Sequence, residues 1–193
     1  ISEKLLQDHV VKAEILLHGS FATTGIGHGT DKALIAGLLG MRPDDIRIPD
    51  SFFLAKKDGM EFSFSTITLK DAHPNTAVLR LTGEHGRKIE VQAASIGGGR
   101  ILIAKLDGIE VNFSAEKPTL IVHNVDQPGH VAQVTSMLAE KQVNIATLQL
   151  YRDKRGGYAV MVIETDQEVP EESVAWLEQL DGIIKVTYIN VEE

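Results

Sequence analysis

The sequence predicts an α+β protein of two domains: an α/β layer with a mainly antiparallel sheet, then a smaller βαββαβ unit. Two observations carry this prediction. Apolar residues recur with the period of strands in some segments and with the spacing of helices in others. The 193 residues are 43% hydrophobic and 24% charged, which is typical of a globular chain with enough residues for two cores. We place the boundary near 115–118, giving domains over 1–117 and 118–193.

The first domain alternates glycine-rich turns with short apolar segments. A glycine-rich loop follows the first strand, and Asp107-Gly108 is a favoured dipeptide for a two-residue hairpin turn. We therefore expect several antiparallel pairs. The predicted helices are about Thr30–Leu39 and Asp50–Lys57, and the predicted strands are Ala13–Leu17, Met60–Phe64, Ala77–Leu81, Ile89–Ala93, Arg100–Leu106 and Ile109–Phe113.

The second domain has the cleaner pattern. Val131, Val134 and Leu138 recur at helical spacing, Asp126 is a candidate N-cap, and Gly182 is a stop signal. The order βαββαβ is the ferredoxin-like arrangement. The predicted elements are strand Thr119–His123, helix His130–Gln142, strands Asn144–Arg152 and Tyr158–Thr165, helix Pro170–Leu180 and strand Ile183–Ile189.

Composition excludes several classes of protein. A formal charge of −8 argues against nucleic-acid binding, which requires clustered Lys and Arg. No apolar run approaches the roughly 20 residues that span a bilayer, so we expect no membrane span and a cytoplasmic location. Without cysteine the chain forms no disulfide and ligates no iron–sulfur cluster by itself, and we expect no metal site. Because the chain starts at Ile1, we expect a further N-terminal segment.

Three polar segments of the first domain are candidate functional sites. Gly25-Ile26-Gly27-His28-Gly29-Thr30-Asp31 leads into a helix, whose free N–H groups favour anions, and Asp31 could orient His28. The alternative is a plain strand-to-helix turn with Thr30 as N-cap and His28 exposed. In His73-Pro74-Asn75-Thr76, Pro74 stiffens the loop and could hold the side chains of His73 and Asn75 in fixed directions. The alternative is a structured turn in which Asn75 makes only a local hydrogen bond to the backbone. Ser95-Ile96-Gly97-Gly98-Gly99 is either an anion-receiving nest or a hairpin turn.

The turn after the first strand of the second domain is a further candidate. Polar side chains and free N–H groups at a helix start suit the carboxylate and amine of a small amino acid, and capping is the alternative explanation. The candidate residues for binding such an amino acid are Asn124, Asp126, Gly129 and Asn144, and the resemblance given below makes them the candidate effector-binding residues.

These segments resemble two known families. Asp126-Gln127-Pro128-Gly129-His130, followed by Val143-Asn144-Ile145, resembles the ACT domain, a regulatory module that binds amino acids. Gly19-Ser20-Phe21-Ala22 and the three polar segments together resemble the beta chain of bacterial iron–sulfur L-serine dehydratase. The first domain is also similar to the allosteric substrate-binding domain of some phosphoglycerate dehydrogenases.

The resemblance implies the conversion of L-serine to pyruvate and ammonia, with a [4Fe-4S] cluster held by cysteines of a separate alpha chain. It implies catalytic roles for His28, Asp31 and His73, and substrate contacts from Gly29, Thr30, Asn75 and Thr76. It also implies a serine-rich Ser-Ser-Ser-His-Thr segment, which we expect before Ile1. Serine is the first effector to test, and paired ACT domains predict a homodimer. The alternative function is a non-catalytic amino-acid-sensing module of a phosphoglycerate dehydrogenase-like enzyme.

Overall fold

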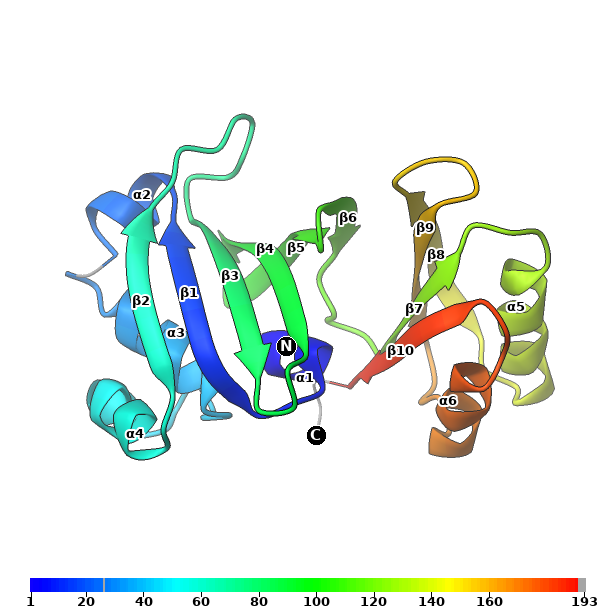
Figure 1. Cartoon of the computed structure of the whole chain (residues 1–193), viewed down its shortest axis with the longest axis horizontal. Helices are drawn as coiled ribbons and strands as arrows, with labels where there is room; N and C mark the ends of the chain where they lie inside the picture. Colours follow the sequence, from blue (N-terminus) through cyan, green and yellow to red (C-terminus); the bar gives the residue numbers. More distant parts are fainter. Residues whose placement is uncertain (26, 191–193) are drawn as a thin grey trace. The chain divides into compact units, whose positions relative to one another are not determined.

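The computed structural model describes residues 1–25 and 27–190, and confirms the predicted α+β class (Figure 1). The chain forms two compact units, Ile1–Gly108 and Ile109–Glu193. This division falls in the Asp107-Gly108 turn, whereas the sequence places the domain boundary near residue 117. The domain boundary at 117 stays a prediction.

The first sheet has the strand order β2-β1-β3-β4-β5-β6. Its β1–β2 pair is parallel, and the β1–β3, β3–β4 and β4–β5 pairs are antiparallel. The strands are β1 Val10–Leu17, β2 Glu61–Thr66, β3 Thr76–Gly83, β4 Lys88–Gly97, β5 Arg100–Leu106 and β6 Ile109–Phe113. The helices are α1 Ser2–Leu6, α2 Gly19–Thr23, α3 Thr30–Leu38, the 3-10 turn η1 Ile48–Asp50 and α4 Ser51–Lys57.

The central strands of this sheet have one apolar and one charged face. Ile15 of β1 lies beside Leu79 of β3, and both are buried. On the opposite face Arg80 bridges two carboxylates, with Nε 2.7 Å from Glu90 and Nη1 3.4 Å from Glu14. The alternation fixes the register of the sheet, since a shift of one residue would bury these charges.

Two helices of the first unit were not predicted from the sequence. Helix α1 has five residues, and α2 begins at Gly19 in the segment predicted as a glycine-rich loop. Helices this short gain little from their own hydrogen bonds, so contacts with other segments decide whether they form.

The second sheet has the order β10-β7-β9-β8, and its β10–β7, β7–β9 and β8–β9 pairs are antiparallel, which confirms the ferredoxin-like prediction. Two helices pack on one face, where Val134 and Leu138 of α5 and Leu177 of α6 meet Leu120 and Met161 of the sheet. The elements are β7 Thr119–Val125, α5 His130–Glu140, β8 Ile145–Arg152, β9 Tyr158–Thr165, α6 Glu171–Glu178 and β10 Ile183–Ile189.

The caps of two helices differ from the predicted ones. Gly29 is the N-cap of α3 in place of Thr30, which is the first helical residue. Gly129 is the N-cap of α5 in place of Asp126. Both glycines have a positive φ, of 73° and 106°, which a residue with a side chain rarely adopts. In the described part of the chain, no helix has the length and apolar character needed to cross a membrane.

Candidate functional site

Segments that are far apart in the sequence meet at one end of the first sheet. Strand β1 ends where β3 begins, with Leu17 opposite Ala77. The backbone N–H of His18 donates to Thr76 O at 2.9 Å, and that of Ser20 donates to Pro74 O at 2.8 Å. Figure 1 shows α2 and the loop between β2 and β3 at the same end of the sheet. The start of α2 thus rests directly on the His73–Thr76 segment.

Gly19 makes this close approach possible. Its φ is +56°, and a Cβ at this position would lie 2.5 Å from Pro74 O. A side chain would therefore meet backbone, which cannot move without displacing the loop.

The Ser95–Gly99 segment lies beside the same loop. Ala94 of β4 pairs with Thr76 of β3, and the backbone N–H of Ser95 donates to Asn75 O at 3.0 Å. Gly97 is the last residue of β4, and Gly98 and Gly99 form the turn to β5; all three have a positive φ and are exposed. The hairpin interpretation of this segment is confirmed, and anion binding by the turn stays a prediction.

His73 is held by its own loop. Its Nδ1 accepts the backbone N–H of Asn75 at 3.1 Å, and the Thr76 hydroxyl donates to His73 O at 2.6 Å. Because Nδ1 accepts, the neutral ring carries its proton on Nε2. The side chain is exposed, so this Nε2–H is a donor available to a ligand.

His28 follows α2 in a tight turn. The backbone N–H groups of His28 and Thr30 both donate to Gly25 O, at 3.2 and 2.9 Å. The His28 side chain is exposed, and no hydrogen bond or ion pair between described residues engages its ring or joins it to His73. Ile26, which belongs to the predicted segment, lies outside the described residues.

Among the described residues, no hydrogen bond or ion pair joins Asp31 to His28. Its Oδ1 accepts the backbone N–H of Lys32 at 2.8 Å, in the first turn of α3. The Thr30 N–H is also taken, by Gly25 O. Asp31 thus occupies the helix start where the sequence suggested that a ligand anion could bind, and its catalytic role stays a prediction.

His18 lies beside the loop that bears His73, although no motif in the sequence indicated it. It is half-buried, and its Nδ1 lies 3.2 Å from Leu69 N and 3.3 Å from Ile67 O. The signal in the sequence is only its position between a strand and Gly19-Ser20. Among the described residues, no group of three or more histidine, aspartate and glutamate side chains could hold a metal ion.

Three predicted effector residues lie together at the end of β7. Asn124 is buried, and its Nδ2 donates to Val125 O at 2.7 Å while its Oδ1 has no partner. Asp126 Oδ2 accepts from the Gly156 N–H at 2.9 Å and from Arg152 Nη1 at 3.0 Å. These donors hold the pKa of the Asp126 carboxyl below its usual range. Gly129 caps α5 immediately after this turn.

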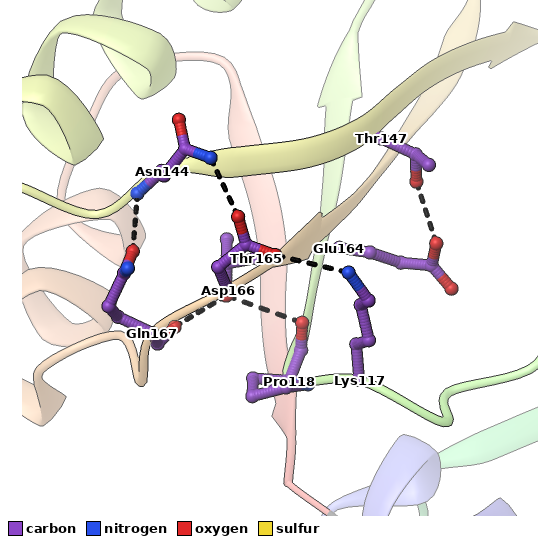
Figure 2. A network of polar contacts seen from close by, with 8 residues as sticks. All are labelled: Lys117, Pro118, Asn144, Thr147, Glu164, Thr165, Asp166 and Gln167. Atoms are coloured by element: carbon purple, nitrogen blue, oxygen red, sulfur yellow. Dashed lines mark hydrogen bonds and ion pairs between the residues drawn. The ribbon is translucent and has the colours of Figure 1, made fainter.

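Asn144 lies at the opposite end of the same sheet. It precedes β8, and its Nδ2 donates to Asp166 Oδ2 at 2.7 Å, while its backbone N–H donates to Gln167 Oε1 at 2.7 Å. Figure 2 shows both contacts, with Lys117 Nζ 3.1 Å from Asp166 on the other side. Since β7 runs the length of the sheet between the two sites, a single chain does not bring Asn144 to Asn124.

Two buried histidines border the β7–α5 turn and were not predicted as site residues. His123 Nδ1 contacts the Tyr158 hydroxyl, and its Nε2 has no partner. Burial, with a smaller effect of Lys185, lowers the pKa of His123 to about 4, so the ring is neutral near pH 7. His130 Nδ1 lies 3.2 Å from Gln133 Oε1, which can only accept from it.

Comparison with known proteins gives matches to both units. The family described as serine dehydratase beta chain matches residues 1–56, and the ACT domain family matches residues 118–182. The chain is 33% identical over 192 residues to the L-serine dehydratase beta chain of Peptoniphilus asaccharolyticus, which covers 99% of this chain and 86% of the relative. It is 37% identical over 175 residues to a probable L-serine dehydratase beta chain of Bacillus subtilis (strain 168), covering 91% and 79%.

A second group of relatives consists of D-3-phosphoglycerate dehydrogenases. The D-3-phosphoglycerate dehydrogenase of Methanocaldococcus jannaschii is 27% identical over 192 residues, covering 97% of this chain and 35% of that enzyme. The region of similarity therefore includes nearly all of this chain but only about a third of the larger dehydrogenase.

Proposed function

The chain belongs to the L-serine dehydratase beta-chain family, and we propose that it completes, with an alpha chain, a site that converts L-serine to pyruvate and ammonia. The observation that carries the proposal is the convergence of the His73, Ser95 and Gly19 segments at one sheet end, with the His28 turn leading directly out of α2. These segments bring exposed polar side chains and open backbone to one end of the sheet, which supports an active site there.

The two exposed histidines suit complementary parts of this reaction. Loss of water from serine requires a base for the α-proton, and His28 has a ring without a bonded partner in the described chain. His73 has its Nδ1 occupied by the Asn75 N–H, so it presents Nε2–H as a donor. We assign proton abstraction to His28 and a hydrogen bond to the substrate carboxylate to His73. Gly29, Thr30, Asn75 and Thr76 would shape the surrounding contacts.

The cofactor in this proposal belongs to the partner. The chain has no cysteine, so its own residues do not fit as ligands of a [4Fe-4S] cluster. We assign the cluster to the alpha chain and restrict the roles above to the proton and hydrogen-bond chemistry of this chain.

Anaerobic co-expression with the alpha chain tests the activity. The purified complex should release pyruvate from L-serine, and this chain alone should release none. A purified, cluster-loaded complex that leaves L-serine unchanged would contradict the proposal. The second candidate, a regulatory module, is supported by the similarity to D-3-phosphoglycerate dehydrogenase and predicts serine binding without activation of an alpha chain.

We also propose that the ACT domain binds a small amino acid, serine first, between two copies of the chain. Strand β8 is at the edge of its sheet, where another strand can pair with it. In an antiparallel β8–β8 pair, the start of one strand lies beside the end of the other. This arrangement would bring Asn144 of the second copy toward Arg152, which binds Asp126. It would unite the two halves of the predicted effector set.

Saturating L-serine should raise the melting temperature of the chain if it binds at Asn124 and Asp126. A ligand at 100 times its Kd stabilises the native state by about 2.7 kcal/mol, which corresponds to several degrees. The Asn124→Ala and Asp126→Asn variants should lose most of this shift, each compared with its own melting temperature without serine. Gln179→Ala, at an exposed position on the C-terminal side of α6, should keep it. An equal shift in all four proteins would place serine elsewhere.

A further inference from the structure

We propose that His18 is a positioning residue, which fixes the loop bearing His73 relative to the turn bearing His28; this inference rests on the proposed function. His18 is the last residue before α2, directly after β1. It lies where the two histidine-bearing segments meet in the fold, although it is 10 residues from His28 and 55 from His73 in the sequence.

Three hydrogen bonds hold the β2–β3 loop against residues 18–20. At one end of the loop, the Leu69 N–H donates to His18 Nδ1 at 3.2 Å. At the other end, the backbone N–H of His18 donates to Thr76 O, and that of Ser20 donates to Pro74 O. The intervening residues, which include His73, are therefore fixed on both sides by the same short segment.

The contact with Leu69 requires an acceptor at the Nδ1 position. A backbone N–H can only donate, so the His18 ring accepts at Nδ1 and carries its proton on Nε2. In this tautomer Nδ1 cannot also donate to Ile67 O, although that oxygen is 3.3 Å away. The ring is half-buried, so removing the acceptor would leave the Leu69 N–H without its protein partner.

His18 is also connected to the turn that bears His28, because it directly precedes α2 and the turn follows that helix. Helix α2 starts at Gly19, and the carbonyls of its second and third residues accept the N–H groups that begin the turn: Thr24 N–H donates to Ser20 O, and Gly25 N–H donates to Phe21 O. The Ile67 N–H donates to Leu17 O at 2.9 Å, so loss of the Leu69 bond would leave the residues between Ile67 and Pro74, His73 included, free to shift relative to α2 and His28. Displacements of about 1 Å in an active site can cost on the order of 100-fold in rate.

Three substitutions separate the acceptor from the bulk of the side chain. Asparagine places its Oδ1 close to the position of the histidine Nδ1, glutamine places its acceptor one bond further out, and leucine has none. In the complex with the alpha chain, we expect His18→Asn to keep kcat for L-serine within about threefold of the wild type. We expect His18→Gln and His18→Leu to lower kcat about 10- to 100-fold with a smaller change in KM.

Amide hydrogen exchange at Leu69 gives a readout that does not depend on activity. It should be slow in the wild type and in His18→Asn, and faster in the other two variants. His9→Leu is the matched control, because His9 is an exposed histidine of the same unit that pairs with Asp58 and is outside the site. It should keep the wild-type kcat.

The outcomes distinguish this inference from the proposed function. Wild-type kcat in His18→Leu, or equal losses in the asparagine and glutamine variants, would overturn the role of His18 alone. A wild-type complex that forms no pyruvate would overturn the proposed function itself. The inference is supported if, of the three variants, only His18→Asn keeps both the wild-type activity and slow exchange at Leu69.

Discussion

The His28→Ala variant, assembled with the alpha chain, is expected to dehydrate L-serine 100- to 10,000-fold more slowly than the wild type. This is the usual range for loss of a general base. The variant should unfold with the wild-type free energy within about 0.5 kcal/mol, because the side chain is exposed and makes no bond in the described chain. Single-turnover measurement of pyruvate formation, together with urea unfolding, separates the two effects.

His73→Ala should also lower kcat/KM, and part of this loss should be a higher KM, because we assign His73 a hydrogen bond to the bound substrate. The matched control is His9→Ala, which removes an exposed imidazole outside the site. If His28→Ala and His73→Ala both retain full activity while the wild-type complex is active, the assignment of this sheet end as the active site is wrong.

The Gly19→Ala variant is expected to lose about as much activity as His28→Ala and to lose more stability than that variant. The left-handed backbone at this position costs a residue with a side chain about 1–2 kcal/mol. The added Cβ of Gly19→Ala would in addition lie 2.5 Å from Pro74 O, so α2 and the His73 loop must separate. We expect kcat to fall about 100-fold, since both catalytic histidines depend on this contact.

Gly59→Ala is the control for backbone strain. Its φ is +84°, yet no atom lies within 4 Å of the added Cβ. This variant should lose about 1–2 kcal/mol of stability and none of the activity. If Gly19→Ala and Gly59→Ala lose equal stability and both remain fully active, the contact between Gly19 and Pro74 does not organise the site.

Much of the fold could be predicted because its strands carry local signals. Arg100–Leu106 and Ile109–Phe113 have the predicted bounds, and the Asp107-Gly108 turn between them has positive φ at both residues, as its sequence implies. The second unit also followed from spacing, since its helices each have one apolar side. Helix α2 could not be predicted, because its five residues are positioned by Pro74 and Thr76, more than 50 positions away.

The candidate site could be predicted only as separate pieces. Sequence motifs indicated His28, His73 and the glycine segments, but their meeting depends on the register that sets Leu17 opposite Ala77. His18 lacked a local signal, because its partner is Leu69. Asn144 is the opposite case. The sequence motif groups it with Asn124, but within a single chain the fold places it at the other end of the sheet, where it binds Asp166.

A titration of the anaerobically purified alpha chain with this chain tests whether the two chains share one active site. We expect the cluster-bearing alpha chain alone to form little pyruvate from L-serine, and added wild-type chain to raise the rate to a plateau at a fixed ratio. The His28→Ala chain should compete for the same alpha chain and lower that plateau. A cluster-loaded alpha chain that is fully active alone, or that binds this chain without any gain in rate, would contradict a shared active site.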